Sequence, residues 1–323
     1  MKLAFIIDPI HRLDPGHDSS IAMMEAAQLL GHEVWITEAR WLSVIQGQAH
    51  APLQRVQLTP VELVAGRWQA ADPWYSLGEP ELLPLSEMQA VFMRKDPPAN
   101  DAYLYATYIL DYIDPSKTLV LNAPDGLRKA NEKMYALQFQ TVMPTTLVSA
   151  RKADILQFVA HQGKAVMKPL DGKGGEGILF LAAGDRNLNS MVELSTQRER
   201  LPVMVQAYLP AASEGDKRII LLHGEAIGAV NRVPSGDEFR GNMAVGGRAD
   251  ATEITERDRE ICDLVAPILQ RDGLYFVGLD VIGGYLTEVN VTSPTGIREI
   301  DRLSGVRLGE QIIAWLVEHL AKA

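Results

Sequence analysis

A glycine-rich segment that follows a lysine is the first part of this sequence that could do chemistry. Residues 166–178 read VMKPLDGKGGEGI, and Gly172-x-Gly174-x-x-Gly177 within them matches the dinucleotide-binding fingerprint. That fingerprint needs a strand before the glycines and a helix after them. The residues after Gly177 are Ile-Leu-Phe-Leu, which is typical of a strand, so the glycines are predicted to join two strands. Such a hairpin exposes backbone N–H groups that can surround an anion, although an ordinary mobile hairpin would have the same letters.

A second set of candidate residues lies near the C-terminal end of the sequence. Glu288 and Asn290 are two positions apart in an apolar run, so on a strand they face the same side. Asp280 lies on the preceding apolar run. Carboxylate and amide oxygens are hard ligands that suit a Mg²⁺ ion shared with phosphates. The alternative is a solvated outer face with alternating polar residues.

Further candidates could hold the rest of a nucleotide. Lys133 and Lys168 are possible phosphate cations, although a lysine at a strand end is commonly just solvated. The end of the strand-like run Val205-Gln206-Ala207-Tyr208-Leu209 could contact an adenine edge, and Asp216 could accept from a ribose hydroxyl.

Size and composition limit the classes of protein that remain. With 323 residues the chain is long enough for two or three compact units, and its 47% hydrophobic content is ordinary for a globular protein. A formal net charge of −10 argues against nucleic acid or an anionic membrane as the main partner. We find no secretory signal and no apolar run near the ~20 residues that span a bilayer. The single cysteine, Cys262, excludes an internal disulfide, suits a reducing cytoplasm and is expected to pack in a helix.

The helices and strands that must position these residues follow two different patterns along the chain. The first third alternates strands and helices, with strands expected at residues 3–7, 33–37, 90–93 and 118–121 and a helix at 20–30, as in an open α/β sheet. Residues 46–85 contain five prolines that should break any long element, leaving short strands.

From about residue 124 the pattern becomes helix, glycine hairpin and helix, and then strands at 203–208, 218–222 and 226–233. Residues 234–248 form a glycine-rich loop of the kind that serves as a lid. Thr255-x-x-Asp258 is a capping box that opens a helix. A closing hairpin at 275–291 and a helix near 312–320 end the chain.

Together these segments resemble the prokaryotic glutathione synthetases of the ATP-grasp superfamily from end to end. The matching motifs, in order, are D8-P-I, D18-S-S, M93-R-K-D-P-P, Y105-A-T-Y-I-L, L127-R-x-x-N-E-K133, K168-P-L-D-G-x-G-G, Y208-L-P, G215-D-K-R, R240-G-N, G246-G-R, G278-L-D and L286-T-E-V-N-V-T-S-P-T. The resemblance implies an α/β ATP-grasp fold, in which an N-terminal open α/β sheet domain precedes two α+β subdomains that clamp ATP. It places the N-terminal substrate domain at 1–123, the small subdomain with the glycine flap at 124–200, and the C-terminal subdomain with lid and metal site at 201–323. The glycines would then hold ATP rather than NAD.

The resemblance also implies a role for each matching residue. Arg218, Arg232 and Lys168 are the expected catalytic residues. ATP is expected to contact Lys133, Lys168, Gly172, Gly174, Gly175, Gln206, Ala207, Tyr208, Leu209 and Asp216. Asp280, Glu288 and Asn290 would hold Mg²⁺, with Mn²⁺ as a substitute. The expected substrate-binding residues are Asp8, Ser19, Ser20, Arg94, Lys95, Asp96, Arg240, Asn242 and Arg298.

The implied activity is that of an ATP-dependent carboxylate–amine ligase, which joins γ-L-glutamyl-L-cysteine to glycine through an acyl phosphate. A related ligase with another acid or amine, or a non-catalytic ATP-binding regulator, is the alternative. The resemblance further implies a cytoplasmic homo-oligomer, a tetramer. A two-residue loop at Gly283-Gly284 would place Asp280 opposite Thr287, on the face away from Glu288. If Asp280 and Glu288 are to share a metal, the pairing of the hairpin must therefore shift by one residue. A three-residue loop, Gly283-Gly284-Tyr285, with a glycine at positive φ and a bulge, would do this most simply.

Overall fold

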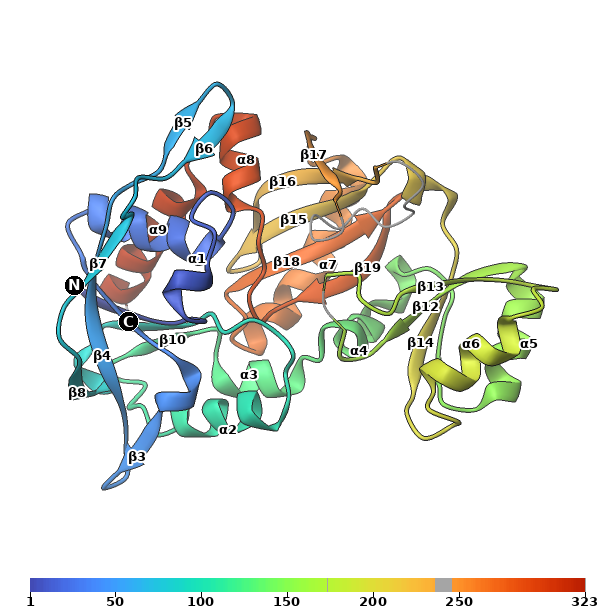
Figure 1. The fold of residues 1–323 in the computed structure, drawn as a ribbon, viewed down its shortest axis with the longest axis horizontal. Helices are drawn as coiled ribbons and strands as arrows, with labels where there is room; N and C mark the ends of the chain where they lie inside the picture. The colour runs from blue at the N-terminus through green and yellow to red at the C-terminus, as the bar shows by residue number, and fades with distance from the viewer. Residues whose placement is uncertain (173, 236–245, 323) are drawn as a thin grey trace.

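Three β-sheets organise the part of the chain that the computed structural model describes, residues 1–172, 174–235 and 246–322. An eight-stranded sheet lies at one end of the molecule, a five-stranded sheet in the middle and a four-stranded sheet at the other end (Figure 1). Both chain termini lie on the side of the eight-stranded sheet (Figure 1). The fold is therefore of the predicted α/β class, with the glycine-rich segment between the middle and the far sheet.

The centre of the eight-stranded sheet is parallel. Its strands β10 (Leu119–Leu121), β9 (Ala90–Met93), β1 (Lys2–Ile6) and β2 (Glu33–Thr37) are neighbours in that order. Residues 3–6 of β1 and 34–37 of β2 are buried, as expected for parallel strands that helices cover on both faces. The strands predicted in the first third are thus confirmed, with boundaries that differ by a residue or two.

Residues 43–84 add the antiparallel part of this sheet and a separate ribbon. The strands are β3 (Ser43–Ile45), β4 (Gln48–Leu58), β5 (Glu62–Val64), β6 (Arg67–Gln69), β7 (Tyr75–Leu77) and β8 (Glu81–Pro84). Most are short as predicted, but the expectation that proline breaks every long element was wrong for β4. Pro52 lies inside it and pairs with Leu82 of β8, whereas β2 pairs with β4 only at Arg55 and Gln54. The missing N–H of Pro52 therefore leaves no gap toward β2.

Helices from both ends of the chain cover this sheet. The helix α1 (Ser19–Leu29) begins at Asp18, whose carboxylate accepts from the N–H groups of Ser20 and Ile21 at 2.7 and 2.9 Å. The last helix, α9 (Leu308–Lys322), packs along α1 so closely that a Cβ on Gly309 would lie 2.8 Å from the carbonyl oxygen of Ala22. The N-terminal unit is thus completed by the end of the chain. Among the described helices, none has the length and apolar character needed to cross a membrane.

The four-stranded sheet carries the glycine hairpin. It is antiparallel, in the order β11 (Thr146–Ser149), β14 (Val203–Ala207), β12 (Lys164–Pro169) and β13 (Leu179–Ala182). The predicted strand–glycine–strand arrangement is confirmed, because β12 and β13 flank the glycines. The helices α5 (Lys152–Gln162) and α6 (Leu188–Ser195) pack against this sheet around a small core of their own. Because β14 pairs with both β11 and β12, this unit includes a strand that the predicted division at residue 200 assigns to the next one.

The five-stranded sheet is antiparallel and lies in the middle of the molecule. Its order is β17 (Arg248–Ala251), β16 (Glu225–Val233), β15 (Asp216–Leu222), β18 (Phe276–Ile282) and β19 (Tyr285–Asn290). In chain order, α2 (Asp101–Leu110) lies between β9 and β10, α3 (Pro124–Lys129) and α4 (Glu132–Ala136) lie between β10 and β11, and α8 (Ile297–Ser304) follows β19. The helix α4 lies directly beside β19, which brings the segment around Lys133 to this sheet.

The helix α7 (Glu256–Arg271) covers one face of the middle sheet and contains the single cysteine. Its capping box is confirmed: Asp258 N donates to Thr255 Oγ1 at 3.2 Å and Thr255 N donates to Asp258 Oδ2 at 2.9 Å. Cys262 is 4% exposed, and burial raises the pKa of its thiol to about 12. A protonated thiol inside an apolar layer has a packing role, as predicted.

Candidate active site

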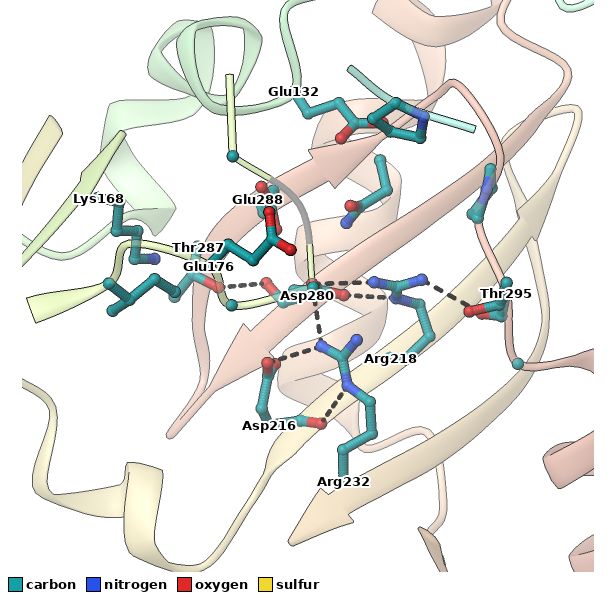
Figure 2. Close-up of a pocket in the computed structure, with 18 of the residues that line it drawn as sticks. Glu132, Lys168, Glu176, Asp216, Arg218, Arg232, Asp280, Thr287, Glu288 and Thr295 are labelled. Atoms are coloured by element: carbon teal, nitrogen blue, oxygen red, sulfur yellow. Dashed lines mark hydrogen bonds and ion pairs between the residues drawn. The ribbon is translucent and has the colours of Figure 1, made fainter. Parts of the chain in front are cut away.

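A cleft of about 560 Å³ runs between the glycine hairpin, the middle sheet and the loop before α1. Figure 2 shows its central part, where charged side chains from several elements meet. All the residues predicted to serve ATP, the metal and catalysis line this cleft: Lys133, Lys168, Gly172, Gly174, Gly175, Gln206, Ala207, Tyr208, Leu209, Asp216, Arg218, Arg232, Asp280, Glu288 and Asn290. The structure thus brings together residues that are up to 157 positions apart (290 − 133).

The glycine hairpin needs its glycines for steric reasons. Gly177 has φ +68°, and a Cβ there would lie 3.0 Å from Cγ of Pro169. A Cβ on Gly172 would lie only 2.8 Å from the same atom. Lys133 Nζ donates to the carbonyl oxygen of Gly172 at 2.7 Å, so the hairpin is tied to α4. Gly172 and Gly177 can therefore pack this closely on Pro169 only because they have no side chain.

Two arginines and two aspartates form a buried network at the centre of the cleft. Cross-strand pairing places Arg218 beside Asp280 and Asp216 beside Arg232. Arg218 Nε lies 2.5 Å from Asp280 Oδ1, Arg232 Nη2 lies 2.9 Å from Asp280 Oδ2, and the same Nη2 lies 2.6 Å from Asp216 Oδ2 (Figure 2). Arg218 Nη1 also donates to the carbonyl oxygen of Thr295 at 3.2 Å.

The pKa values of the two carboxylates in this network shift in opposite directions. Burial acts to raise the pKa of Asp280, but Arg218 and Arg232 overcome it and hold that pKa far below its usual range. Burial raises the pKa of Asp216 to about 6, against the attraction of Arg232. Asp280 is therefore a fixed anion that orients both guanidinium groups, which are rigid donors suited to phosphoryl and carboxylate oxygens.

A β-bulge, rather than a longer loop, brings Asp280 to the same face as Glu288. The turn between β18 and β19 is the two-residue Gly283-Gly284, with φ of 54° and 77°, because Ile282 pairs with Tyr285. The three-residue loop predicted from the sequence was therefore wrong. The register then shifts between Asp280 and Val281, so that Asp280 pairs with Glu288. The predicted bulge and positive-φ glycines are both present. As predicted, Asp280 lies on the same face of the hairpin as Glu288.

The predicted metal ligands fit Mg²⁺ unequally. Asn290 Nδ2 donates to the carbonyl oxygen of Gly278 at 3.2 Å, which leaves its amide oxygen for a cation. Glu288 uses Oε1 to meet Lys133 Nζ at 3.0 Å. Both oxygens of Asp280 already face guanidinium groups. Within the described residues, no group of three or more His, Cys, Asp or Glu side chains is arranged to hold a metal. The donor set therefore offers hard oxygens chiefly from Glu288 and Asn290.

Lys168 and the end of β14 form the wall opposite the arginines. Lys168 Nζ donates to Gln206 Oε1 at 2.8 Å, and Gln206 Nε2 donates to Thr146 Oγ1 at 3.1 Å. Burial lowers the pKa of Lys168, and the charge of Glu288 partly opposes this. The N–H groups of Ala207 and Tyr208 already donate to the carbonyls of Thr145 and Lys164. An adenine contact at this edge must therefore use other atoms.

The predicted substrate-binding residues are placed differently from the predicted ATP residues. Only Asp96 lines the cleft; Asp8, Ser19, Ser20, Arg94, Lys95 and Arg298 are not among the residues that line it. Arg240 and Asn242 lie outside the described residues, as does most of the lid predicted at 234–248. Asp8 instead accepts from Lys95 Nζ at 3.1 Å and lines a second cavity at the carboxyl ends of β1 and β2.

Three of these side chains connect the N-terminal unit to the segment that follows β19. Arg94 Nε donates to Ser20 Oγ at 3.0 Å, and Arg94 Nη2 donates to the carbonyl oxygen of Pro294 at 2.9 Å. The N–H of Ile297 donates to Ser19 Oγ at 3.3 Å. In this structure the three residues therefore hold one wall of the cleft in place.

Several residues that line the cleft are not among those predicted from the sequence. Glu132 Oε1 accepts from the N–H groups of Val291 and Thr292 at 3.1 and 3.2 Å, which fixes α4 against β19. It precedes Lys133 in the motif N131-E-K, which was the available signal. His17 and Glu299 both line the cleft and form an ion pair with each other, although they are 282 positions apart, and no sequence signal joined them.

Comparison with protein families accounts for nearly the whole chain. Residues 1–128 match the family described as prokaryotic glutathione synthetase, N-terminal domain, and residues 132–305 match prokaryotic glutathione synthetase, ATP-grasp domain. A protein named glutathione synthetase from Thermosynechococcus vestitus is 69% identical over 316 residues, which cover 98% of this chain and 99% of that protein. Another from a Nostoc species is 67% identical over 320 residues, covering 99% of each chain.

Solved structures share the fold at low sequence identity. The D-cycloserine synthetase DcsG superposes with a TM-score of 0.65 at 14% identity, covering 99% of this chain and all of that one. The ATP-grasp ligase PsnB, solved with a phosphomimetic variant of its minimal precursor, Mg and ADP, gives a TM-score of 0.62 at 18% identity over 98% of this chain and 97% of that one. At these identities the likeness establishes the fold alone.

Proposed function

Because this chain belongs to the prokaryotic glutathione synthetases of the ATP-grasp superfamily, we propose that it joins γ-L-glutamyl-L-cysteine to glycine. ATP is cleaved to ADP and phosphate in the same reaction. The observation that supports this best is the buried network of Arg218, Asp280, Arg232 and Asp216 in a cleft that the glycine hairpin overlies.

The reaction needs ATP because a carboxylate is a poor electrophile. In the first step an oxygen of the cysteinyl carboxylate attacks the γ-phosphorus, and the bond to the leaving ADP breaks. The product is an acyl phosphate. In the second step the glycine amine attacks the carbonyl carbon, inorganic phosphate leaves, and the nitrogen loses its extra protons. Two anions meet in the first step, so the site must supply positive charge that is already in position.

The arginines are the groups best placed to act on the reacting atoms. Both are more than 90% buried, and Asp280 fixes their planes. In a water-poor cleft such fixed donors stabilise charge that develops on phosphoryl and acyl oxygens. Lys133 and Lys168 would contact the phosphates from the side of the glycine hairpin. Mg²⁺, when bound by Glu288 and Asn290 with help from Asp280, would neutralise further phosphate charge.

Asp216 is suited to the ribose of ATP. Its Oδ2 meets Arg232, and its Oδ1 is buried without a hydrogen-bond partner among the described residues. A buried carboxylate oxygen without a donor costs free energy, and a ribose hydroxyl would supply the missing donor. Gln206, Ala207, Tyr208 and Leu209 line the same end of the cleft and would enclose the base.

Phosphate release measured with and without each substrate tests this proposal. We expect release only when γ-glutamylcysteine, glycine and ATP are all present with Mg²⁺, and one glutathione for each phosphate. Release that needs a different acid or amine would replace the proposed substrates while leaving the ligase chemistry. Tight ATP binding with no release under any combination would contradict an enzymatic function.

Three further expectations belong to this proposal. We propose that the chain works in the cytoplasm, that it forms a homo-oligomer, and that its units divide near residue 123 and after β14, since the pairing of β14 moves the second boundary from 200 to beyond Ala207. Analytical ultracentrifugation would test assembly, with a tetramer as the expected species. Limited proteolysis would test the division, because exposed linkers between units are cut first.

A further inference from the structure

One carboxylate in the cleft has no assigned role and an unused oxygen. Glu299 lies on α8, is 7% exposed and lines the cleft. Its Oε1 pairs with His17 Nδ1 from the loop before α1. Its Oε2 is buried and has no hydrogen-bond partner within the described part of the chain. Since a buried carboxylate oxygen normally accepts a hydrogen bond, a donor is missing at this point.

The position of Glu299 is fixed by its neighbours. The adjacent Arg298 donates to Glu25 Oε2 at 2.7 Å and to the carbonyl oxygen of Pro15 at 3.0 Å, which clamps α8 to the N-terminal unit. Arg298 and Glu25 are both about 95% buried, so this clamp is shielded from water. Glu299 is therefore held rigidly, as a group that selects a ligand needs to be.

The charge of this wall favours a cation. Besides Glu299, the carboxylates of Asp14 and Asp18 line the same end of the cleft, against the cationic side chains of Arg12 and His17. His17 compensates only one oxygen of Glu299. A ligand group that carries several N–H donors and a positive charge would satisfy Oε2 and balance the wall.

We propose that Glu299, positioned by His17, binds the α-ammonium group of the γ-glutamyl residue of the acid substrate. The inference rests on the proposed function and adds the group by which the acid is recognised. Glu299 is then a specificity-determining residue, and His17 is a positioning residue.

The distance from the reacting atoms favours this ammonium group over that of glycine. The carbonyl oxygen of Thr295 accepts from Arg218, and Glu299 follows four residues later as the third residue of α8, so at most ~14 Å of chain separates the two residues. The ammonium group of the dipeptide is separated from its reacting carboxylate by roughly two residues of extended chain, about 7 Å. The glycine nitrogen must instead approach within ~3 Å of the acyl carbon.

The test compares γ-glutamylcysteine with glutarylcysteine, which lacks only the ammonium group. In the unchanged protein we expect kcat/KM to be about 100-fold higher for γ-glutamylcysteine, as for the loss of one charged hydrogen bond in a buried site. Glu299→Gln should reduce this ratio to below about 10 and leave the KM for glycine within about twofold. His17→Gln should reduce the ratio partially, because the carboxylate remains but loses its orienting partner.

Asp301→Asn is the matched control, because Asp301 lies on the same helix and is not among the residues that line the cleft. It should leave the ratio unchanged. A ratio that survives Glu299→Gln, or a raised KM for glycine in that variant, would overturn the inference. If thermal unfolding shows that Glu299→Gln does not fold, the ratio in His17→Gln tests the inference instead. A partial reduction would support it, and an unchanged ratio would overturn it. Failure of the unchanged protein to use γ-glutamylcysteine at all would overturn the proposed function, and the inference with it.

Discussion

Asp280 and Glu288 are direct cross-strand partners although the turn between their strands has only two residues. A hairpin with regular pairing beyond this turn would place Asp280 opposite Thr287, on the other face. The bulge at Thr287 makes two residues of β19 oppose one of β18, and the carboxylates then share a face. Thr287 Oγ1 donates to the carbonyl oxygen of Asp280 at 3.2 Å, which stabilises the irregularity. Asp280 can thus orient the arginines beside the residues proposed to hold the metal.

The first prediction concerns the charge of Asp280. Asp280→Asn keeps the shape of the side chain but removes the anion that both Arg218 and Arg232 contact. We expect kcat to fall by about 100-fold, because the guanidinium groups lose the partner that fixes their direction. We also expect weaker Mg²⁺ binding and a protein that remains folded at 25 °C. Stopped-flow phosphate release, Mg²⁺ titration and thermal unfolding would measure the three quantities.

Asp250→Asn provides the control for this change. Asp250 also pairs with an arginine on the same sheet, Arg248, but the arginine side chain is 70% exposed. An exposed pair contributes little, so kcat should stay within about twofold. If the two variants have the same kcat, Asp280 has no role in catalysis.

The second prediction concerns Arg232. Arg232→Ala should lower kcat by about 100- to 1,000-fold and change the Kd for ATP by less than about tenfold, since a group that acts on developing charge affects the transition state most. Isothermal titration would give the affinity and single-turnover kinetics the rate. Arg248→Ala removes an exposed arginine from the neighbouring strand and should change neither. A normal kcat in Arg232→Ala would leave Arg232 as a purely structural partner of Asp216.

The third prediction concerns the choice of amine. A closed site built around glycine has no room for a side chain on the α-carbon, so serine should react at least about 100-fold more slowly than glycine in kcat/KM. Product formation with each amine at saturating γ-glutamylcysteine and ATP would measure the ratio. Comparable values for the two amines would show that the pocket does not select by size.

The fourth prediction concerns stability and pH. Burial raises the pKa of Asp301 to about 6, and Leu308 N donates to its Oδ1 at 2.9 Å. Its folded pKa thus exceeds the ordinary value near 4 of an unfolded chain, so the native state binds the extra proton. Stability from this group is full below about pH 4 and is lost as the pH rises toward 6, because the native state must then bury a charge.

Asp301→Asn should therefore stabilise the protein at pH 8 by about 1 kcal/mol, after allowance for partial exposure, and by less at pH 5. Urea unfolding of both proteins at the two pH values would measure the difference. An equal effect at pH 5 and pH 8 would show that the charge of Asp301 is not involved.

The sequence could predict those parts of the fold that local pattern controls. Apolar runs specified β2 and β9 to the residue, and the spacing Thr255-x-x-Asp258 located the start of α7. The geometry of the hairpin at Gly283-Gly284 was harder to predict. A longer turn and a bulge both move Asp280 to the other face of its strand, and only the register of the folded strands shows which of the two is present. Pro52 was misleading because its tolerance depends on which neighbour β4 has at that position.

Of the residues in the candidate site, some could likewise be predicted from local motifs and others could not. Residues near the glycine hairpin and on β15 to β19 could be placed from motifs, since neighbouring strands bring short segments together. Ser19, Ser20 and Arg94 occur in matching motifs too, yet in the structure they hold the segment after β19. His17 and Glu299 were missed because their pairing depends on how α8 docks on the N-terminal unit, which no local pattern encodes.

The packing of α9 on α1 has a consequence for synthesis of the chain. The helices begin at Ser19 and Leu308, so 289 residues (308 − 19) separate them. At ~5–20 residues per second, α1 emerges from the ribosome about 15–60 s before the helix that covers it. Through that interval the apolar surface around Ala22 and Ala26 lacks its partner. A nascent chain stalled before α9 should therefore bind chaperones through α1, and release of the complete chain should end that binding.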